Sequence, residues 1–154
     1  MKIAVYKEQK FRTPLDMERS IGLWVDRIGY QHQDRAVIPS FRILGQYAAL
    51  SVEAGSGRLE ILGRPPLPLR LGDAFLLFPS LPMRYRPDRD WEIRWIVWNG
   101  PEADLLLKIG CLAEGQPILP GQAGAVRLAF DRLDPLMDRP DRPALLARKT
   151  LLLT

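Results

Sequence analysis

Residues 91–98, with the sequence WEIRWIVW, carry the strongest β-strand pattern in the chain. Successive side chains of a strand point to opposite faces of a sheet, so the odd-numbered residues from Trp91 to Val97 share one face. That face is wholly apolar and can line the inside of a barrel. The opposite face, from Glu92 to Trp98, begins polar and ends apolar, which predicts that a helix covers its last part.

Strand-like alternation extends over about residues 24–98. A mostly apolar run at 46–53 ends in Gly55-Ser56-Gly57, which predicts a tight hairpin. The prolines in residues 65–68 indicate an edge or irregular strand. Gly72-Asp73 predicts a turn before a buried strand at 74–79. Short strands at this spacing predict a small antiparallel β-barrel over about residues 41–100.

After Gly100 the apolar residues recur every three or four positions, which predicts two or three helices. Pro101 suits the first position of one helix, a second begins at about Gln122, and a third begins near Asp141. A dimer interface can lie on the second helix or on the last one. The second helix has an apolar face that can form this interface or can cover the sheet, and the sequence leaves both alternatives open. The residues of that face are Val126, Phe130 and Leu133.

The length of 154 residues predicts a single domain. The net charge of +4 comes from arginines that alternate with acids, which argues against direct DNA contact by this chain. A single cysteine excludes an intrachain disulfide and suits the cytoplasm. No apolar run reaches the ~20 residues of a membrane helix, and no membrane partner is expected. The apolar, uncapped end at residues 151–154 leads us to expect that the chain is cut from a longer protein.

Residues for catalysis or metal binding are scarce. His32 and Cys111 are the only histidine and cysteine, and they cannot build an iron, manganese or zinc site, so no metal or other cofactor is expected. His32 lies in a polar stretch, residues 30–34, that is typical of a loop, and Cys111 is expected to be a small buried hydrophobe. No serine lies in a G-x-S-x-G elbow. We therefore predict no catalytic residues and no enzyme activity.

Aromatic and arginine side chains in the strands remain as candidates for binding. Trp91, Trp95 and Tyr85 could stack on a sugar or an aromatic ring, and Arg42 or Arg84 could hold a hydroxyl or carboxylate. The same tryptophans could instead fill a dry core, as side chains do in many small barrels. The residues alone do not decide between these alternatives.

Taken in order, several stretches make the chain similar to one known family. Gly72-Asp73, Pro79, Tyr85 and the spaced tryptophans before Gly100 follow a family pattern. With these features the sequence resembles the N-terminal effector-binding and dimerisation domain of AraC-family transcription regulators, which has a cupin-like fold. The stretches that carry the resemblance are residues 41–57, 71–79, 81–85 and 91–100.

The resemblance implies a regulatory domain made of an N-terminal arm at 1–23, a β-barrel at 24–100 and a helical, dimer-forming part at 101–154. It implies a small effector in the barrel, a homodimer, and a DNA-binding module that is absent from this chain. Two alternatives stay open: a cupin-type enzyme, such as an isomerase or dioxygenase, and a structural dimerisation module with a filled barrel.

The resemblance also implies the residues that bind the effector. By position, Arg42, Tyr85, Ile93 and Trp95 match sugar-contacting places in the arabinose-responsive member. Ile93 is apolar where that member has a polar ring, and Met83 stands where many members carry histidine. Both departures remove hydrogen-bonding capacity and favour an apolar or aromatic effector, or a closed pocket. The expected ligand-binding set is Arg42, Tyr47, Met83, Tyr85, Ile93 and Trp95.

Overall fold

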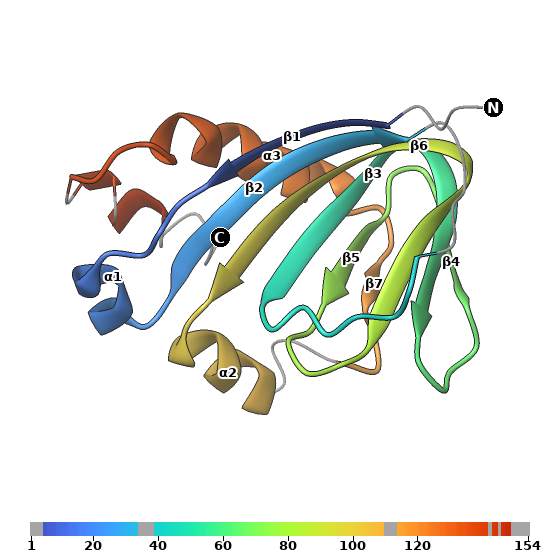
Figure 1. Cartoon of the computed structure of the whole chain (residues 1–154), viewed down its shortest axis with the longest axis horizontal. Coiled ribbons are helices and arrows are strands. Elements are labelled where there is room, and N and C mark those ends of the chain that lie inside the picture. Colours follow the sequence, from blue (N-terminus) through green and yellow to red (C-terminus); the bar gives the residue numbers. More distant parts are fainter. Residues whose placement is uncertain (1–4, 34–38, 110–113, 142, 145, 149–154) are drawn as a thin grey trace.

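The computed structural model describes residues 5–33, 39–109, 114–141, 143–144 and 146–148. More of the described chain lies in β-strands than in helices, and most of the helices follow the long strands (Figure 1). The elements in chain order are β1 (Val5–Phe11), α1 (Asp16–Ile21), β2 (Trp24–Gln33), β3 (Tyr47–Ile61), β4 (Leu67–Leu69), β5 (Ala74–Leu77), β6 (Met83–Asn99), α2 (Pro101–Lys108), β7 (Ile118–Leu119), α3 (Ala123–Leu133) and the 3-10 helix η1 (Asp134–Leu136).

The strands form one antiparallel sheet in the order β1-β2-β6-β3-β5-β7, and β4 pairs with the far end of β3. The long strands β3 and β6 pair from Tyr47 opposite Trp98 to Ile61 opposite Met83. Figure 1 shows the strands curving around a common interior. The predicted mainly-β antiparallel fold is confirmed. The sheet is nevertheless not a closed barrel, because β1 and β7 stand at opposite ends of the strand order.

The predicted hairpin at Gly55-Ser56-Gly57 is wrong, because these residues lie inside the continuous strand β3. The pairing with β6 shifts between Val52 and Ala54 and again between Gly55 and Gly57, as it does at β-bulges. Gly55 has a positive φ of 77°. A Cβ atom on Gly57 would lie 2.3 Å from the carbonyl oxygen of Arg86. The glycines therefore permit a bend and a close approach to β6 rather than a chain reversal.

The loop predicted for the polar stretch around His32 is also wrong for residues 30–33. These residues belong to β2, where His32 lies between Tyr6 of β1 and Glu92 of β6. Polar side chains do not prevent strand formation here because β2 pairs on both sides. Residues 5–11 of the expected N-terminal arm form β1 and pair with β2 along their whole length.

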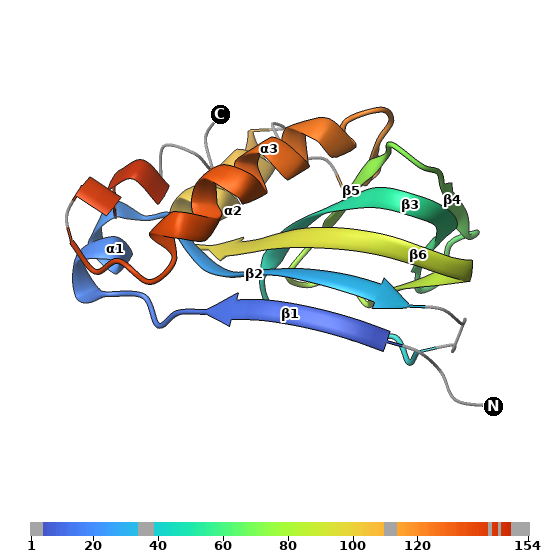
Figure 2. The same ribbon diagram turned by 90° about the horizontal axis from the view of Figure 1, so that it is seen from above.

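Two apolar clusters hold the fold together. The inner one contains the odd-numbered residues of β6 from Trp91 to Val97, all buried as predicted. The outer one places Ile96 of β6 against Phe130 and Leu133 of α3. Figure 2 shows α3 lying along one face of the sheet. The expectation that a helix covers the last part of the outer face is thus confirmed.

The helices begin close to their predicted positions. α2 starts at Pro101, α3 starts one residue after Gln122, and residues 143–144 and 146–148 are helical near the third predicted start. Cys111 and the apolar end at residues 151–154 lie outside the described residues. Among the helices that the structure describes, none combines the length and apolar character needed to span a membrane.

Candidate ligand-binding site

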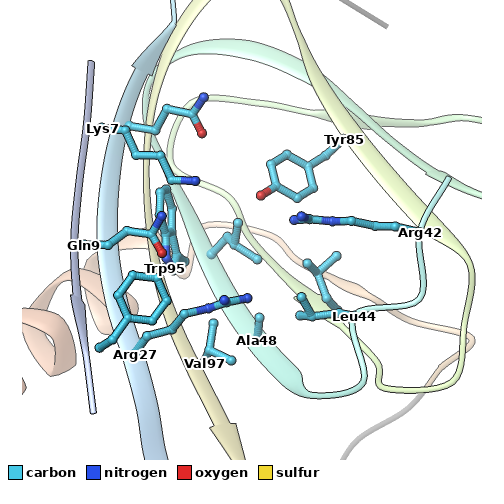
Figure 3. A pocket seen from close by; sticks show the side chains of 13 residues that line it. Lys7, Gln9, Arg27, Arg42, Leu44, Ala48, Tyr85, Trp95 and Val97 are labelled. Atoms are coloured by element: carbon cyan, nitrogen blue, oxygen red, sulfur yellow. The ribbon is translucent and has the colours of Figure 1, made fainter. Parts of the chain in front are cut away.

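A cavity of about 250 Å³ lies between the β1–β2 edge of the sheet and the strands β3, β5 and β6 (Figure 3). A neighbouring hollow of about 330 Å³ shares Lys7, Gln31, Arg42 and Tyr85 with it and extends over Ser40 toward the surface. The interior is therefore not completely filled by side chains. The cavity is concave like a ligand pocket and lies just below the ~300–1,000 Å³ range of pockets for drug-sized ligands, so it suits a compact molecule.

The period-two geometry of β1 directs Lys7, Gln9 and Phe11 to the cavity. The ammonium nitrogen of Lys7 lies 5.6 Å from the ring centroid of Trp95. The guanidinium carbon of Arg27, from β2, lies 5.7 Å from the ring centroid of Phe11. Both distances fall within the range of a cation–π interaction. The edge strand β1 is thus bound to the cavity wall through side chains as well as through its backbone pairing.

The position of the Trp95 ring depends on Gly29 of β2, which is its direct cross-strand partner. A Cβ atom on Gly29 would lie 2.3 Å from two carbon atoms of the Trp95 ring. Only glycine leaves room for the indole to lie against β2. This cross-strand pair therefore fixes an aromatic wall of the cavity.

Arg42 enters the cavity from the connection between β2 and β3. Its backbone pairs with that of Met83, with N–O distances of 3.1 and 3.0 Å, which holds this connection against β6. In Figure 3 the Arg42 guanidinium points toward the hydroxyl of Tyr85. Burial raises the pKa of Tyr85, while the charges of Arg42 and Arg27 and a hydrogen bond with Arg42 oppose that rise. The phenol is neutral and available for hydrogen bonding at physiological pH.

Lys7 experiences the same charges. Burial lowers the pKa of Lys7, and the positive charges of Arg42 and Arg27 lower it further. Three cationic groups thus act on one another across the cavity.

Three of the six predicted ligand-binding residues meet at the cavity: Arg42, Tyr85 and Trp95. Met83 and Ile93 are buried in the inner cluster and do not line it. The expectation of an apolar or aromatic effector was drawn from these two residues. Because neither of them lines the cavity, they do not support that expectation.

Tyr47 is also buried away from the cavity lining. Its hydroxyl donates a hydrogen bond of 2.9 Å to an Asp104 carboxylate oxygen, and its ring stacks on Trp98 with the centroids 6.0 Å apart. Burial and Asp104 raise the pKa of Tyr47 to about 12. Tyr47 therefore joins α2 to the sheet.

The residues predicted for dimerisation face the sheet of their own chain. Phe130 and Leu133 are buried in the outer cluster, and Val126 packs against it. Within one chain, these three residues therefore make the contacts of a helix that covers the sheet.

Sequence reasoning missed the polar half of the cavity: Lys7 and Gln9 of β1, and Arg27 and Gln31 of β2. No alternation of polar and apolar residues could have revealed them, because residues 7–10 are all polar. Which of these side chains face the cavity becomes clear only once the pairing of β1 with β2 is known. The described part of the chain contains no group of three or more His, Cys, Asp or Glu residues placed to hold a metal ion.

Several solved structures are similar to the chain in fold. The protein YhaK from Escherichia coli has a TM-score of 0.53 at 11% identity, over 75% of this chain and 49% of that one. A cupin superfamily protein from Desulfitobacterium hafniense has a TM-score of 0.45 at 8% identity, over 59% and 75%. Salicylate 1,2-dioxygenase from Pseudaminobacter salicylatoxidans has a TM-score of 0.43 at 15% identity, over 58% and 23%.

The family follows from the sequence itself. Residues 27–154 match the AraC-like ligand binding domain. The chain belongs to this family, as its resemblance indicated. No curated protein sequence matches the chain.

Proposed function

We propose that this domain senses a small effector and thereby controls a DNA-binding module of its parent protein. The observation that carries the proposal is the cavity, whose walls come from β1, β2 and β6 and from the connection that holds Arg42. A molecule in this cavity would touch the edge strand and the centre of the sheet at once. Membership of a ligand-binding family supports the same function.

A buried charge cluster offers a route from the cavity to the C-terminal part of the chain. Arg12 follows β1 directly and donates a hydrogen bond of 2.8 Å to Glu18, whose carboxylate also pairs at 3.5 Å with Arg148. Arg148 in turn donates hydrogen bonds of 2.7 Å to the carbonyls of Leu136 and Arg139. A ligand that favours one position of β1 would therefore bias the packing of the last described helix, as a two-state sensor requires.

The proposed parent acts as a homodimer, with the contact made by the helical part of this domain. Because Phe130 and Leu133 face the sheet, the partner would contact the outer side of α3 instead, where Leu128 is 51% exposed.

The direct test is a thermal-shift screen of this chain against small anionic, neutral and cationic metabolites, followed by calorimetry on the compounds that raise its Tm. A specific binder stabilises the native state by mass action. Gln9→Trp, which fills the cavity, should abolish the shift. Lys10→Trp is the matched control, because Lys10 pairs with Asp134 at 2.7 Å instead.

Two outcomes contradict the proposal. If no compound of any charge shifts the Tm, effector sensing by this domain fails. If a compound binds the Gln9→Trp variant as tightly as the original chain, binding takes place outside the cavity.

A further inference from the structure

We infer that the effector is a small organic anion, with one carboxylate or phosphate group held by Lys7, Arg27 and Arg42 and a compact apolar body resting on the cavity floor. This inference rests on the proposed sensing function and names the chemistry of its ligand. Figure 3 shows the basis: these cationic side chains reach the same space from β1, β2 and the connection before β3.

The cavity has cations without counter-charges. Among the residues that the structure describes, no Asp or Glu lines it, and no ion pair within 4.0 Å includes Lys7, Arg27 or Arg42. Outside the cavity, about half of the described arginines have such a counter-charge, and those without one, such as Arg89, lie mostly exposed at the surface. The arginines that do have a carboxylate within that distance are Arg12, Arg58, Arg84, Arg94, Arg127, Arg139 and Arg148.

Arg27 supplies a second, independent observation. Its Nε atom is buried and has no hydrogen-bond partner among the described residues. Leaving a buried charged donor unsatisfied is costly, so such a group marks a place where a partner is missing. A carboxylate or phosphate accepts hydrogen bonds in the forked geometry that a guanidinium offers.

Mutual repulsion points the same way. The charges of Arg27 and Arg42 act on Lys7 and lower its pKa, as does burial. Like charges gathered in a cavity destabilise the free protein, and an anion would remove that cost on binding. A neutral sugar could accept hydrogen bonds from Lys7, Arg27 and Arg42, but it would not reduce the repulsion between their positive charges.

The floor of the cavity determines the rest of the ligand. Leu44, Ala48, Leu50 and Val97 line its apolar side, and the Trp95 ring forms a wall. A volume of about 250 Å³ admits only a compact body. Lys7 and Arg42 are exposed and stand at the opening, whereas Arg27 is half-buried. The anionic group would therefore bind between the opening and Arg27, with the apolar body below it.

The test compares matched probes that differ in charge. Benzoate is compared with benzamide, and isovalerate with isovaleramide, by calorimetry with this chain at low salt. Each carboxylate should bind at least about tenfold more tightly than its amide, because a hydrogen bond to a charged group contributes about 1.5–3 kcal/mol. Phenyl phosphate and inorganic phosphate, measured in the same way, separate the two anionic groups and the role of the apolar body.

Charge-removing variants locate the anion. Arg27→Gln and Arg42→Gln should each weaken benzoate binding by at least about tenfold. Arg89→Gln, which removes an exposed arginine of β6 that does not line the cavity, should leave binding unchanged. Lys7→Gln, at the exposed opening, provides a second variant if Arg27→Gln does not fold.

The outcomes separate this inference from the proposed function. Equal binding of acids and amides, or exclusive binding of neutral or cationic metabolites in the screen, overturns the anion and leaves sensing intact. Inorganic phosphate binding as tightly as phenyl phosphate overturns the apolar body. Anion binding that Arg27→Gln, Arg42→Gln and Lys7→Gln all leave unchanged overturns the assigned site. Absence of binding by every compound overturns both proposals.

Discussion

At the scale of single residues, one glycine determines the shape of the cavity. Gly29 faces the Trp95 ring so closely that any Cβ atom would collide with it. Gly29→Ala should therefore displace the indole and lower the free energy of unfolding by about 1–3 kcal/mol, as overpacking does. Chemical denaturation followed by tryptophan fluorescence measures both effects.

Gly124→Ala is the matched control for Gly29→Ala. Gly124 lies in α3, where an added Cβ atom would have no described neighbour within 4 Å, and it has no positive φ. Alanine is the better helix former by up to about 1 kcal/mol, so this variant should be as stable as the original chain or more stable. Equal destabilisation by the two variants would contradict the close packing of Gly29 against Trp95.

Two tyrosines with raised pKa values should make the stability of the protein depend on pH in the alkaline range. Burial and hydrogen bonds to Glu92 and Asp104 raise the pKa values of Tyr30 and Tyr47 to about 12. The folded chain thus keeps each phenol neutral at pH values where the unfolded chain ionises it. This stabilisation is complete below pH about 10, the ordinary tyrosine pKa, and is lost as pH rises toward 12.

The measurement is tyrosinate absorbance alongside circular dichroism as pH rises. We expect alkaline unfolding to coincide with the late tyrosine ionisation, and Tyr47→Phe to remove one late-titrating group. Titration of every tyrosine near its ordinary pKa while the fold is intact would refute the prediction.

At the scale of elements, local pattern predicted strands and helices but not how far each strand runs. Gly55-Ser56-Gly57 is compatible with a hairpin and with a bulged strand, and its pairing with β6 decides the outcome. That pairing joins segments about thirty residues apart, so a local sequence pattern does not contain it. The face that β6 presents, in contrast, follows from alternation alone and was predicted correctly.

The site was predictable only in part for the same reason. Arg42, Tyr85 and Trp95 were found by resemblance, whereas Lys7 and Arg27 lie on strands whose cavity-facing side depends on the β1–β2–β6 register. The unmatched charge of the cavity could not be seen in the sequence, because arginines and acids are interspersed along much of the chain. What marks these cations is that the three share one cavity that no carboxylate of the described residues lines.

The buried cluster of Arg12, Glu18 and Arg148 connects the segment after β1 with the last described helix, and it leads to a prediction about stability. Glu18 is 1% exposed and lies between Arg12 and Arg148, which is fully buried. Glu18→Gln leaves two buried guanidinium groups without their carboxylate and should cost about 3–5 kcal/mol of unfolding free energy. Urea denaturation measures the loss.

The control for Glu18→Gln is Asp16→Asn, which removes an exposed carboxylate from the first turn of the same helix. It should cost no more than about 1 kcal/mol. If the two variants lose similar stability, Glu18 does not hold Arg12 and Arg148 together as described.

At the scale of the whole molecule, the inner and outer faces of the sheet have different tasks. The inner face carries the cavity with its unmatched cations, while the outer face is covered by α3. Arg94 illustrates the contrast, since it lies on the outer side, pairs with Glu53 at 2.7 Å and stands over the Phe130 ring. Arg94 thus has its counter-charge within the chain, whereas no ion pair among the described residues includes the cavity cations Lys7, Arg27 and Arg42.

This division leaves the outer side of α3 as the surface for the proposed homodimer. Leu128 is 51% exposed there, and stable interfaces are centred on buried apolar side chains. Leu128→Glu should therefore convert the dimer to a monomer in size-exclusion chromatography with light scattering. Because Leu128 does not belong to the outer cluster, the monomeric Leu128→Glu variant should still fold and show a cooperative thermal transition. Phe130→Glu, in contrast, would unfold the chain. A monomeric original chain at high micromolar concentration would rule out the homodimer, and a dimer that Leu128→Glu leaves intact would place its contact elsewhere.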